Sequence, residues 1–277
     1  MNSPFDDEAR FRAALTCCSE DAAGATDVGR ARRRNEDAYW VDPQERFALV
    51  ADGLGGLPDG HIASRLAITA AVELLEGRFA PSAGGGKQEE RSALVSRLGM
   101  ALGDAFEAAQ ASVLSQQRPA ASDLTMATTL IGVAIERDLA VMVHVGDVRG
   151  YVWRAGRIVM ATVDHSRLGH LVREGLMPRD QVRFHPERNI VTEVLGIPEG
   201  YSPDVNAIEL EDGDVLVLCS DGLWEAVEED DVARLLEHAG SAGEAATWLI
   251  HAANSAGGRD NITVVVMRHR TQSAACG

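Results

Sequence analysis

Short apolar runs rich in valine and isoleucine recur along the chain, and runs of this kind are typical of β-strands. Most of them are bounded by glycine, by aspartate or by both. The predicted strands cover residues 38–41, 46–51, 130–135, 139–145, 151–153, 215–219 and 262–267.

Four longer segments repeat apolar side chains every three or four residues, which is the spacing of one face of an α-helix. In the first segment, Ile62, Leu66, Ala70 and Leu74 form such a face, and Gly77 is expected to end the helix. Hairpin-like strand pairs separated by helical pairs predict an α+β fold in which helices cover antiparallel sheets. The other three predicted helices cover residues 89–116, 232–239 and 245–256.

Two polar segments are expected to be connections. Pro81–Lys87 is glycine-rich and predicts a flexible loop between the first two helices. Ser166–Gly200 contains three prolines and predicts an excursion from the sheet. The chain is therefore expected to form one domain over residues 25–270, with a flexible segment 1–24 before it and a tail 271–277 after it.

Composition excludes several classes of protein. The 277 residues carry a net charge of −16, so the chain is not expected to wrap a nucleic acid or an anionic membrane. No apolar run approaches the roughly 20 residues of a membrane span, and Met1–Arg10 lacks the features of a signal peptide. The four cysteines are Cys17, Cys18, Cys219 and Cys276, and their spacing matches neither a metal site nor a disulfide framework. This cysteine usage favours a reducing cytoplasm.

Aspartates recur beside the predicted strands. Asp52, Asp147 and Asp221 each follow a strand and have a glycine neighbour, whereas Asp37 and Asp260 precede one. Taken singly, each of these residues is typical of a turn. If all five converge, their like charges raise one another's pKa unless a cation intervenes, so the functional interpretation is a metal site.

The type of donor atom indicates which metal such a site would hold. Carboxylates without cysteine or paired histidine suit Mg²⁺ or Mn²⁺, and two such ions about 4 Å apart can generate a hydroxide and hold a phosphoryl group. A phosphate site is therefore expected nearby, and Arg30, Arg32, Arg33 and Arg34 form a basic run just before Asp37. The run is either a solvated surface stretch or a phosphate-binding one, because a guanidinium can bind two phosphate oxygens at once.

A set of motifs extends this pattern from Thr26 to Val266. In chain order they are Thr26-Asp27-Val28-Gly29, Asn35-Glu36-Asp37, Val50-Ala51-Asp52-Gly53-Leu54-Gly55-Gly56, Met126-Ala127-Thr128-Thr129-Leu130, Val145-Gly146-Asp147, Asp164-His165-Ser166, His185-Pro186-Glu187-Arg188-Asn189, Ser220-Asp221-Gly222-Leu223 and Gly258-Arg259-Asp260-Asn261. Each motif alone is weak evidence for a protein family, whereas the whole set in this order is specific for one family. By these motifs the chain resembles the metal-dependent serine/threonine protein phosphatases of type 2C, the PPM family, in their bacterial form.

The resemblance implies a fold and a set of site residues. The fold is a four-layer αββα sandwich, in which two packed antiparallel sheets are flanked by helix pairs and a mobile flap lies within residues 166–200. At the matched positions, Asp52 bridges two metal ions and Arg32 holds the substrate phosphate. The other implied metal contacts are Asp221 and Asp260 at the first ion, the Gly53 carbonyl and, largely through water, Asp37 at the second, and Asp147 with Asp221 at a weaker third.

The activity implied by the resemblance is hydrolysis of phosphoserine and phosphothreonine in proteins by direct attack of a metal-bound hydroxide. The implied cofactors are two Mn²⁺ or Mg²⁺ ions, and the implied partners are phosphorylated proteins, namely a bacterial serine/threonine kinase and its targets. We expect a cytoplasmic monomer that neither binds nucleic acid nor inserts into membranes. Two interpretations stay open beside this one: a pseudophosphatase, which intact Asp52, Asp221 and Asp260 disfavour, and a structural cation binder, which Arg32 disfavours.

Several histidines lie near the motifs. Many eukaryotic members of the family have a histidine that can act as general acid where this chain has Leu54. His61 is then the nearest histidine candidate, although it also suits the opening of a helix. His144 and His165 adjoin motif residues, and bonding to neighbouring backbone is preferred over catalysis for both. In the flap, the candidate substrate contacts are His185 and Arg188.

Overall fold

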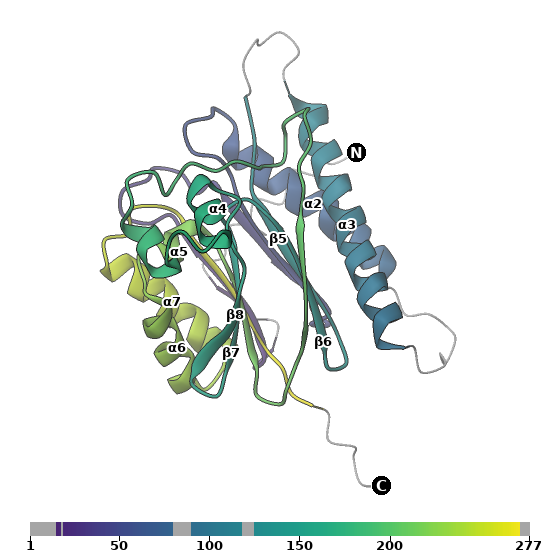
Figure 1. Ribbon diagram of the computed structural model, residues 1–277. Helices are drawn as coiled ribbons and strands as arrows, with labels where there is room; N and C mark the ends of the chain where they lie inside the picture. Colours follow the sequence, from purple (N-terminus) through teal and green to yellow (C-terminus); the bar gives the residue numbers. More distant parts are fainter. Residues whose placement is uncertain (1–14, 18, 80–89, 118–124, 272–277) are drawn as a thin grey trace, which may run out of the picture.

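A computed structural model describes residues 15–17, 19–79, 90–117 and 125–271, and within them the chain forms two antiparallel β-sheets packed face to face (Figure 1). The six-stranded sheet has the order β1-β2-β11-β10-β7-β8, and the five-stranded sheet has the order β3-β4-β5-β6-β9. Each paired neighbour runs antiparallel, as predicted. The loop predicted at Pro81–Lys87 lies outside the described residues.

Seven of the described strands follow the predicted runs, whereas β1, β2, β8 and β9 were not predicted. The six-stranded sheet contains β1 (Leu15–Cys17), β2 (Ala22–Asp27), β7 (Arg149–Arg154), β8 (Arg157–Ala161), β10 (Val215–Cys219) and β11 (Ile262–Arg268). The five-stranded sheet contains β3 (Asp37–Val41), β4 (Phe47–Asp52), β5 (Leu130–Glu136), β6 (Leu139–Val145) and β9 (Asp204–Glu209).

A pair of helices covers the outer face of each sheet, so the predicted four-layer sandwich is confirmed (Figure 1). α2 (Gly60–Arg78) and α3 (Arg91–Gln116) pack on the five-stranded sheet, and α6 (Glu229–His238) and α7 (Ala242–Ser255) pack on the six-stranded sheet. Among the helices of the described segments, none combines the length and apolar character needed to cross a bilayer.

The strand β6 shows why the apolar runs are continuous rather than alternating. Its residues Val141 and Val143 pack towards α2 and α3, whereas Ala140 and Met142 pack between the two sheets. Every position of the strand is buried as a result. A strand buried on both faces is expected to be apolar throughout, and burying each large side chain contributes roughly 1.5–3 kcal/mol.

Two boundaries differ from the prediction. The expected flexible segment 1–24 overlaps β2, in which Ala22 and Ala23 are fully buried. A Cβ on Gly24 would lie 2.3 Å from the ring of Tyr39, so this strand is built from small residues that give no apolar alternation in the sequence. Gly77 does not end its helix, because α2 continues to Arg78.

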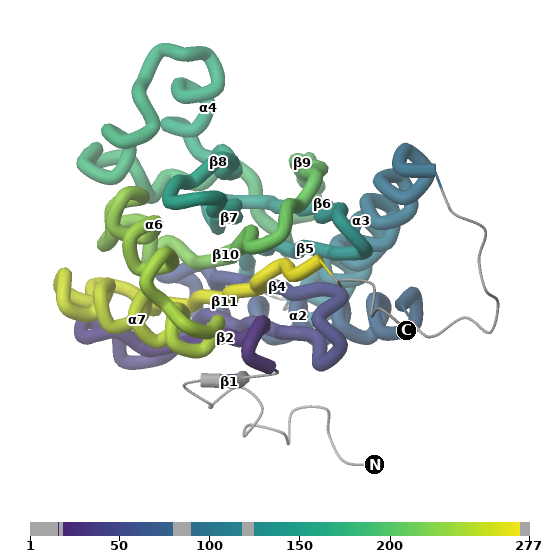
Figure 2. Tube along the Cα trace, turned by 90° about the horizontal axis from the view of Figure 1, so that it is seen from below, coloured from purple at the N-terminus to yellow at the C-terminus, as the bar shows by residue number. Residues whose placement is uncertain are grey.

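Residues 166–200, which we call the flap segment, leave the sheets as predicted. They contain α4 (Arg167–Arg173) and the 3₁₀ helix η1 (Arg179–Phe184), and Figure 2 shows the part around α4 projecting from the sandwich. The remaining short helix, α5 (Asp221–Trp224), directly follows β10. Its first residue is one of the candidate metal ligands, so the end of β10 places that aspartate at the mouth between the sheets.

Candidate metal centre

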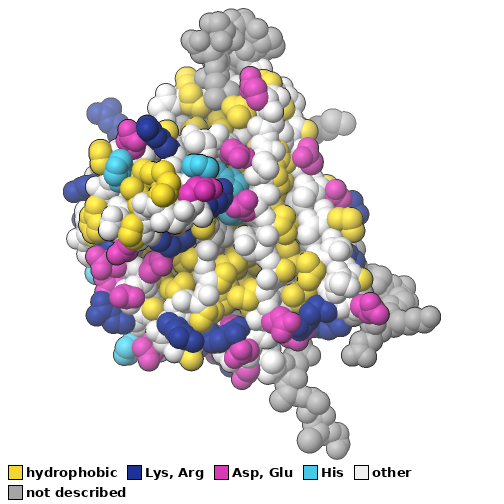
Figure 3. Space-filling view, viewed as in Figure 1, with side chains coloured by type: hydrophobic (Ala, Val, Ile, Leu, Met, Phe, Trp, Pro, Cys, Tyr) yellow, Lys and Arg dark blue, Asp and Glu magenta, His cyan; other side chains and the backbone are white. Residues whose placement is uncertain are grey.

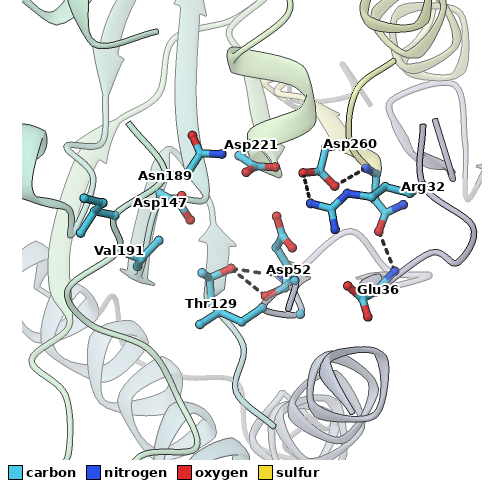
Figure 4. A pocket seen from close by; sticks show the side chains of 14 residues that line it. Arg32, Glu36, Asp52, Thr129, Asp147, Asn189, Val191, Asp221 and Asp260 are labelled. Atoms are coloured by element: carbon cyan, nitrogen blue, oxygen red, sulfur yellow. Dashed lines mark hydrogen bonds and ion pairs between the residues drawn. The ribbon is translucent and has the colours of Figure 1, made fainter. Parts of the chain in front are cut away.

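The aspartates found in the sequence come together at one end of the sandwich. Asp52, Asp147, Asp221 and Asp260 line one pocket of about 430 Å³, together with Arg32 (Figure 4). They arrive from the ends of three strands and from the loop before β11. The convergence considered from the sequence is therefore present, although Arg32 and Asp260 lie 228 positions apart in the chain.

The fifth aspartate, Asp37, is held behind this pocket. It is the first residue of β3 and the register partner of Asp52 in β4. Ser220 donates a hydrogen bond from its hydroxyl to Asp37 Oδ2 at 2.7 Å, and Ser220 Oγ accepts one from the Thr263 amide at 2.9 Å. Because Ser220 directly follows β10 and Thr263 belongs to β11, this link fixes Asp37 to the other sheet across the sandwich.

Backbone contacts fix the Asp52-Gly53 turn. The Thr128 hydroxyl donates to the carbonyl oxygen of Asp52 at 2.8 Å, and the Gly53 amide donates to the Glu36 carbonyl at 3.1 Å. A Cβ on Gly53 would lie 2.2 Å from the carbonyl oxygen of Gly60. Only glycine fits at this position, which lets the start of α2 approach the turn.

Asp147 and Asp221 are positioned from opposite sides of the same crevice. The indole nitrogen of Trp224 donates to the carbonyl oxygen of Asp147 at 2.8 Å, which ties α5 to the end of β6. A Cβ on Gly222 would lie 2.0 Å from the carbonyl oxygen of Asn261, so glycine is required after Asp221 as well. These contacts hold both carboxylates on backbone that is packed from two sides.

Arg32 differs from the other arginines of its run. Arg32 Nη2 donates to Asp260 Oδ2 at 2.7 Å, and its side chain remains 39% exposed at the pocket. Arg30 instead donates to the carbonyl oxygen of Asn254, and Arg34 lies against the ring of His61. Of the four arginines, Arg32 is the one that lines the pocket.

The electrostatics of the cluster favour a bound cation. Burial raises the pKa of Asp37 to about 6, and burial with the nearby Asp164 raises the pKa of Asp147 to about 7. Loss of hydration, together with the surrounding carboxylates, raises the pKa of Asp52 and Asp221 well above the usual range. Such shifts are the expected cost of burying carboxylates close to one another without a counterion.

Two carboxylate oxygens also lack the partners that buried polar atoms normally have. Asp37 Oδ1 and Asp221 Oδ1 are buried and accept no hydrogen bond from the described residues. An unpaired buried oxygen of this kind needs an explanation, and a metal ion supplies one. The donor set is entirely oxygen, so it fits Mg²⁺ or Mn²⁺.

Some residues at the pocket were not identified as functional from the sequence. Glu36, Thr129 and Asn189 line it, and each belongs to a motif in which another residue was emphasised. Asn189 arrives from the flap segment, whose far end is joined to the sandwich by the isolated bridge between Thr128 and Leu195. A sequence motif shows that a residue belongs to a set, but only the fold shows which members reach the pocket.

The candidate histidines lie away from the pocket lining. His144 contacts the carbonyl oxygen of Val163 at 3.1 Å, and His165 accepts a hydrogen bond from the Gly146 amide at 3.4 Å, so both bond to backbone as expected. In the flap segment, His185 accepts from the amide of Glu187, and Arg188 pairs with Glu225 at 3.0 Å.

Comparison with known proteins agrees with this geometry. The family described as protein phosphatase 2C matches residues 29–252. The serine/threonine phosphatase stp of Listeria welshimeri is 32% identical over 246 residues, which cover 87% of this chain and 93% of the relative. A crystal structure of the Mycobacterium tuberculosis serine/threonine phosphatase PstP/Ppp has a TM-score of 0.76 at 30% identity and covers 92% of this chain and 99% of that one. A structure of the PstP catalytic domain with 2 manganese ions has a TM-score of 0.73 at 29% identity, with coverage of 92% and 97%.

Proposed function

The chain belongs to the protein phosphatase 2C family, and from that premise we propose that its aspartate cluster and Arg32 carry out metal-dependent hydrolysis of phosphoserine and phosphothreonine in proteins. The observation that carries the proposal is the pocket itself. It brings four aspartates and one exposed guanidinium together, with Arg32 held 2.7 Å from Asp260. This arrangement combines a site for cations with a site for a phosphate dianion.

In this proposal different aspartates would bind each of two divalent cations. Asp52 would contact both, Asp221 and Asp260 would hold one, and the Gly53 carbonyl with Asp37, largely through water, would hold the other, while Asp147 and Asp221 would offer a weaker third position. When bound, the cations supply an activated water and neutralise charge on the phosphoryl group. The protein's own contribution is rigidity, because Asp37 begins a strand and Asp52, Asp147 and Asp221 lie at or just after the ends of strands.

Arg32 is proposed to orient the phosphate. Its contact with Asp260 uses Nη2 and leaves the other guanidinium edge available in the pocket. A guanidinium that binds two phosphate oxygens fixes the phosphorus in line for attack and contributes through positioning. The pairing with Asp260 also prevents Arg32 from folding back onto the surface.

The proton for the leaving oxygen has no obvious donor beside Asp52. Leu54 lines the pocket and carries no proton, and His61 lies outside it, against Arg34. Burial and the adjacent guanidinium lower the pKa of His61, so its ring is neutral at neutral pH. We therefore propose that solvent in the pocket protonates the leaving group.

Further parts of the proposal concern the setting of the enzyme. We propose that residues 25–270 act as one phosphatase domain, as a monomer in the cytoplasm, on a bacterial serine/threonine kinase and its targets. The metal is proposed to be Mn²⁺ or Mg²⁺. The intact aspartate set and Arg32 support turnover over mere phosphoprotein binding by a pseudophosphatase.

Hydrolysis of a phosphothreonine peptide tests the proposed function. The purified protein is first treated with a chelator and then assayed with and without added Mn²⁺. We expect release of phosphate that depends on the added ion. Full activity in excess chelator would contradict the metal-dependent mechanism, and absence of activity with every divalent ion would favour the pseudophosphatase.

A further inference from the structure

Two buried histidines and an aspartate meet at the base of the flap segment. His144 lies on β6, and its register partner is Asp204, the first residue of β9. His165 lies directly before the flap segment, and its ring centroid is 4.7 Å from that of His144. One ligand atom from each of the three side chains lies within 4.8 Å of the other two. On the face viewed in Figure 3, histidine, acidic and basic side chains gather in the same region as α4.

The His144 ring has a nitrogen that is not satisfied. Nε2 lies 3.1 Å from the carbonyl oxygen of Val163, which can only accept, so Nε2 carries the ring proton. Nδ1 then carries a lone pair and no proton, and this atom is buried without a hydrogen-bond partner in the described residues. Burial and the neighbouring His165 lower the pKa of His144 to about 4. The ring is therefore neutral near pH 7, the state in which imidazole binds a metal.

The other two side chains also have donor capacity. His165 accepts from the Gly146 amide through Nδ1, so its Nε2 faces Asp204 Oδ2 at 3.3 Å. Arg173 contacts the same carboxylate oxygen, and neither contact uses Asp204 Oδ1. The Asp204 side chain is 44% exposed, which gives an ion a route from solvent.

We propose that His144, His165 and Asp204 bind one borderline transition-metal ion, of which Zn²⁺ is the representative. Two imidazoles and a carboxylate are a ligand set typical of zinc, and a site with three protein ligands leaves the fourth position for water. The aspartate cluster contains only oxygen donors and suits harder cations, so the two sites differ in the metals they select. On binding, the single ring proton of His165 moves through solvent from Nε2 to Nδ1, which gives up its 3.4 Å contact with the Gly146 amide, and the Nε2 lone pair of the neutral ring is directed to the ion.

The position of this site gives it a structural consequence. His165 precedes the flap segment, Asp204 follows it, and His144 belongs to β6, which pairs with β9. A bound ion therefore joins both ends of the flap segment to β6. Occupancy restrains the base of the segment that carries Asn189 to the pocket.

The experiment keeps the aspartate cluster filled with excess Mg²⁺ and titrates Zn²⁺ into the full chain by calorimetry. We expect one Zn²⁺ site, with X-ray absorption showing nitrogen donors at about 2.0–2.1 Å. His165→Gln and Asp204→Asn should each weaken Zn²⁺ binding by more than about tenfold, because even outer contacts of a metal site cost 10–100-fold in affinity. The matched control is His170→Gln, since His170 is exposed on α4 and should leave the affinity unchanged.

Two readouts separate a metal site from a metal-free clamp between His165 and Asp204. Hydrogen exchange of the α4 amides should slow when Zn²⁺ is added to the wild-type protein, and Arg173→Met should still bind Zn²⁺. The proposal is overturned if Mg²⁺-saturated protein binds no Zn²⁺, if absorption shows oxygen donors alone, or if folded His165→Gln and Asp204→Asn bind Zn²⁺ as the wild type does.

Discussion

Asp37 and Asp52 are register partners across the antiparallel strands β3 and β4, so two carboxylates stand opposite one another at the mouth of the sandwich. Like charges placed directly opposite in a sheet destabilise it. Loss of hydration is the largest cause of the raised pKa of Asp52, and repulsion from Asp37 is the next largest. The pairing is understandable if a cation lies between the side chains, and the predictions below follow from that interpretation.

Asp221→Asn should abolish most of the activity without unfolding the protein. The change removes one charge from the cluster while conserving the shape of the side chain, and Asp221 is proposed to serve two ions. We expect the rate of phosphopeptide hydrolysis to fall roughly a hundredfold or more, with an unchanged circular dichroism spectrum. Asp230→Asn, on the exposed start of α6, is the control. Near-normal turnover of Asp221→Asn would indicate that Asp221 only forms a turn and does not bind a catalytic metal ion.

Arg32→Ala should impair phosphopeptide hydrolysis far more than Arg30→Ala or Arg34→Ala. Arg32 lines the pocket, whereas Arg30 and Arg34 are engaged elsewhere. A phosphate clamp that acts in the transition state lowers kcat as well as raising KM. Steady-state kinetics of the three variants distinguishes the cases. Equal and small losses at all three positions would identify the run as a solvated basic surface.

His61→Gln should retain most activity on both a phosphopeptide and an aryl phosphate, whose leaving group needs little protonation. The lowered pKa of His61 leaves its ring without the proton that a general acid must donate at neutral pH. Both substrates are compared at the same pH and metal concentration. A large loss confined to the phosphopeptide would make His61 the acid.

The stability of chelated protein should fall as the pH rises from about 5 to about 8. The pKa values of Asp37 and Asp147 in the folded protein, about 6 and about 7, exceed the ordinary value near 3.9, so over this window the folded state binds more protons than the unfolded state. Deprotonation therefore destabilises the folded state, and added Mn²⁺ should raise the Tm more at pH 8 than at pH 6. Thermal unfolding of the double variant Asp37→Asn/Asp147→Asn checks this prediction, because the stability of the variant should change less steeply with pH. An equal slope in the double variant would assign the pH dependence to other groups.

Local pattern predicted the parts of the fold that are buried on both faces. The run 139–145 became β6 with the same bounds, because its neighbours cover it on two sides. β9, over Asp204–Glu209, was missed because it is an edge strand whose side chains alternate between half-buried and exposed and include three polar or charged ones. Short flap helices such as α4 lack the length over which a helical period can be recognised.

The aspartates of the candidate site were predictable from the sequence, whereas the side chains that hold them in place were not. The recurrence of aspartate beside strands identified all five carboxylates, because strand ends are recognisable in the sequence. The Ser220 bond to Asp37 spans 183 positions, and the Trp224 bond to Asp147 spans 77, so no local pattern could indicate either contact. Such long-range bonds arise only when the two sheets pack.

The most direct test of the account is to locate Mn²⁺ by anomalous diffraction in crystals of the protein. Two peaks about 3.5–4 Å apart, both bound to the carboxylate of Asp52, are predicted, and one of them should also contact Asp221 and Asp260. Crystals of folded Asp52→Asn should lose the pair. Mn²⁺ peaks that lie away from Asp52, or a pair that survives unchanged in Asp52→Asn, would contradict the assignment of this cluster as the catalytic metal centre.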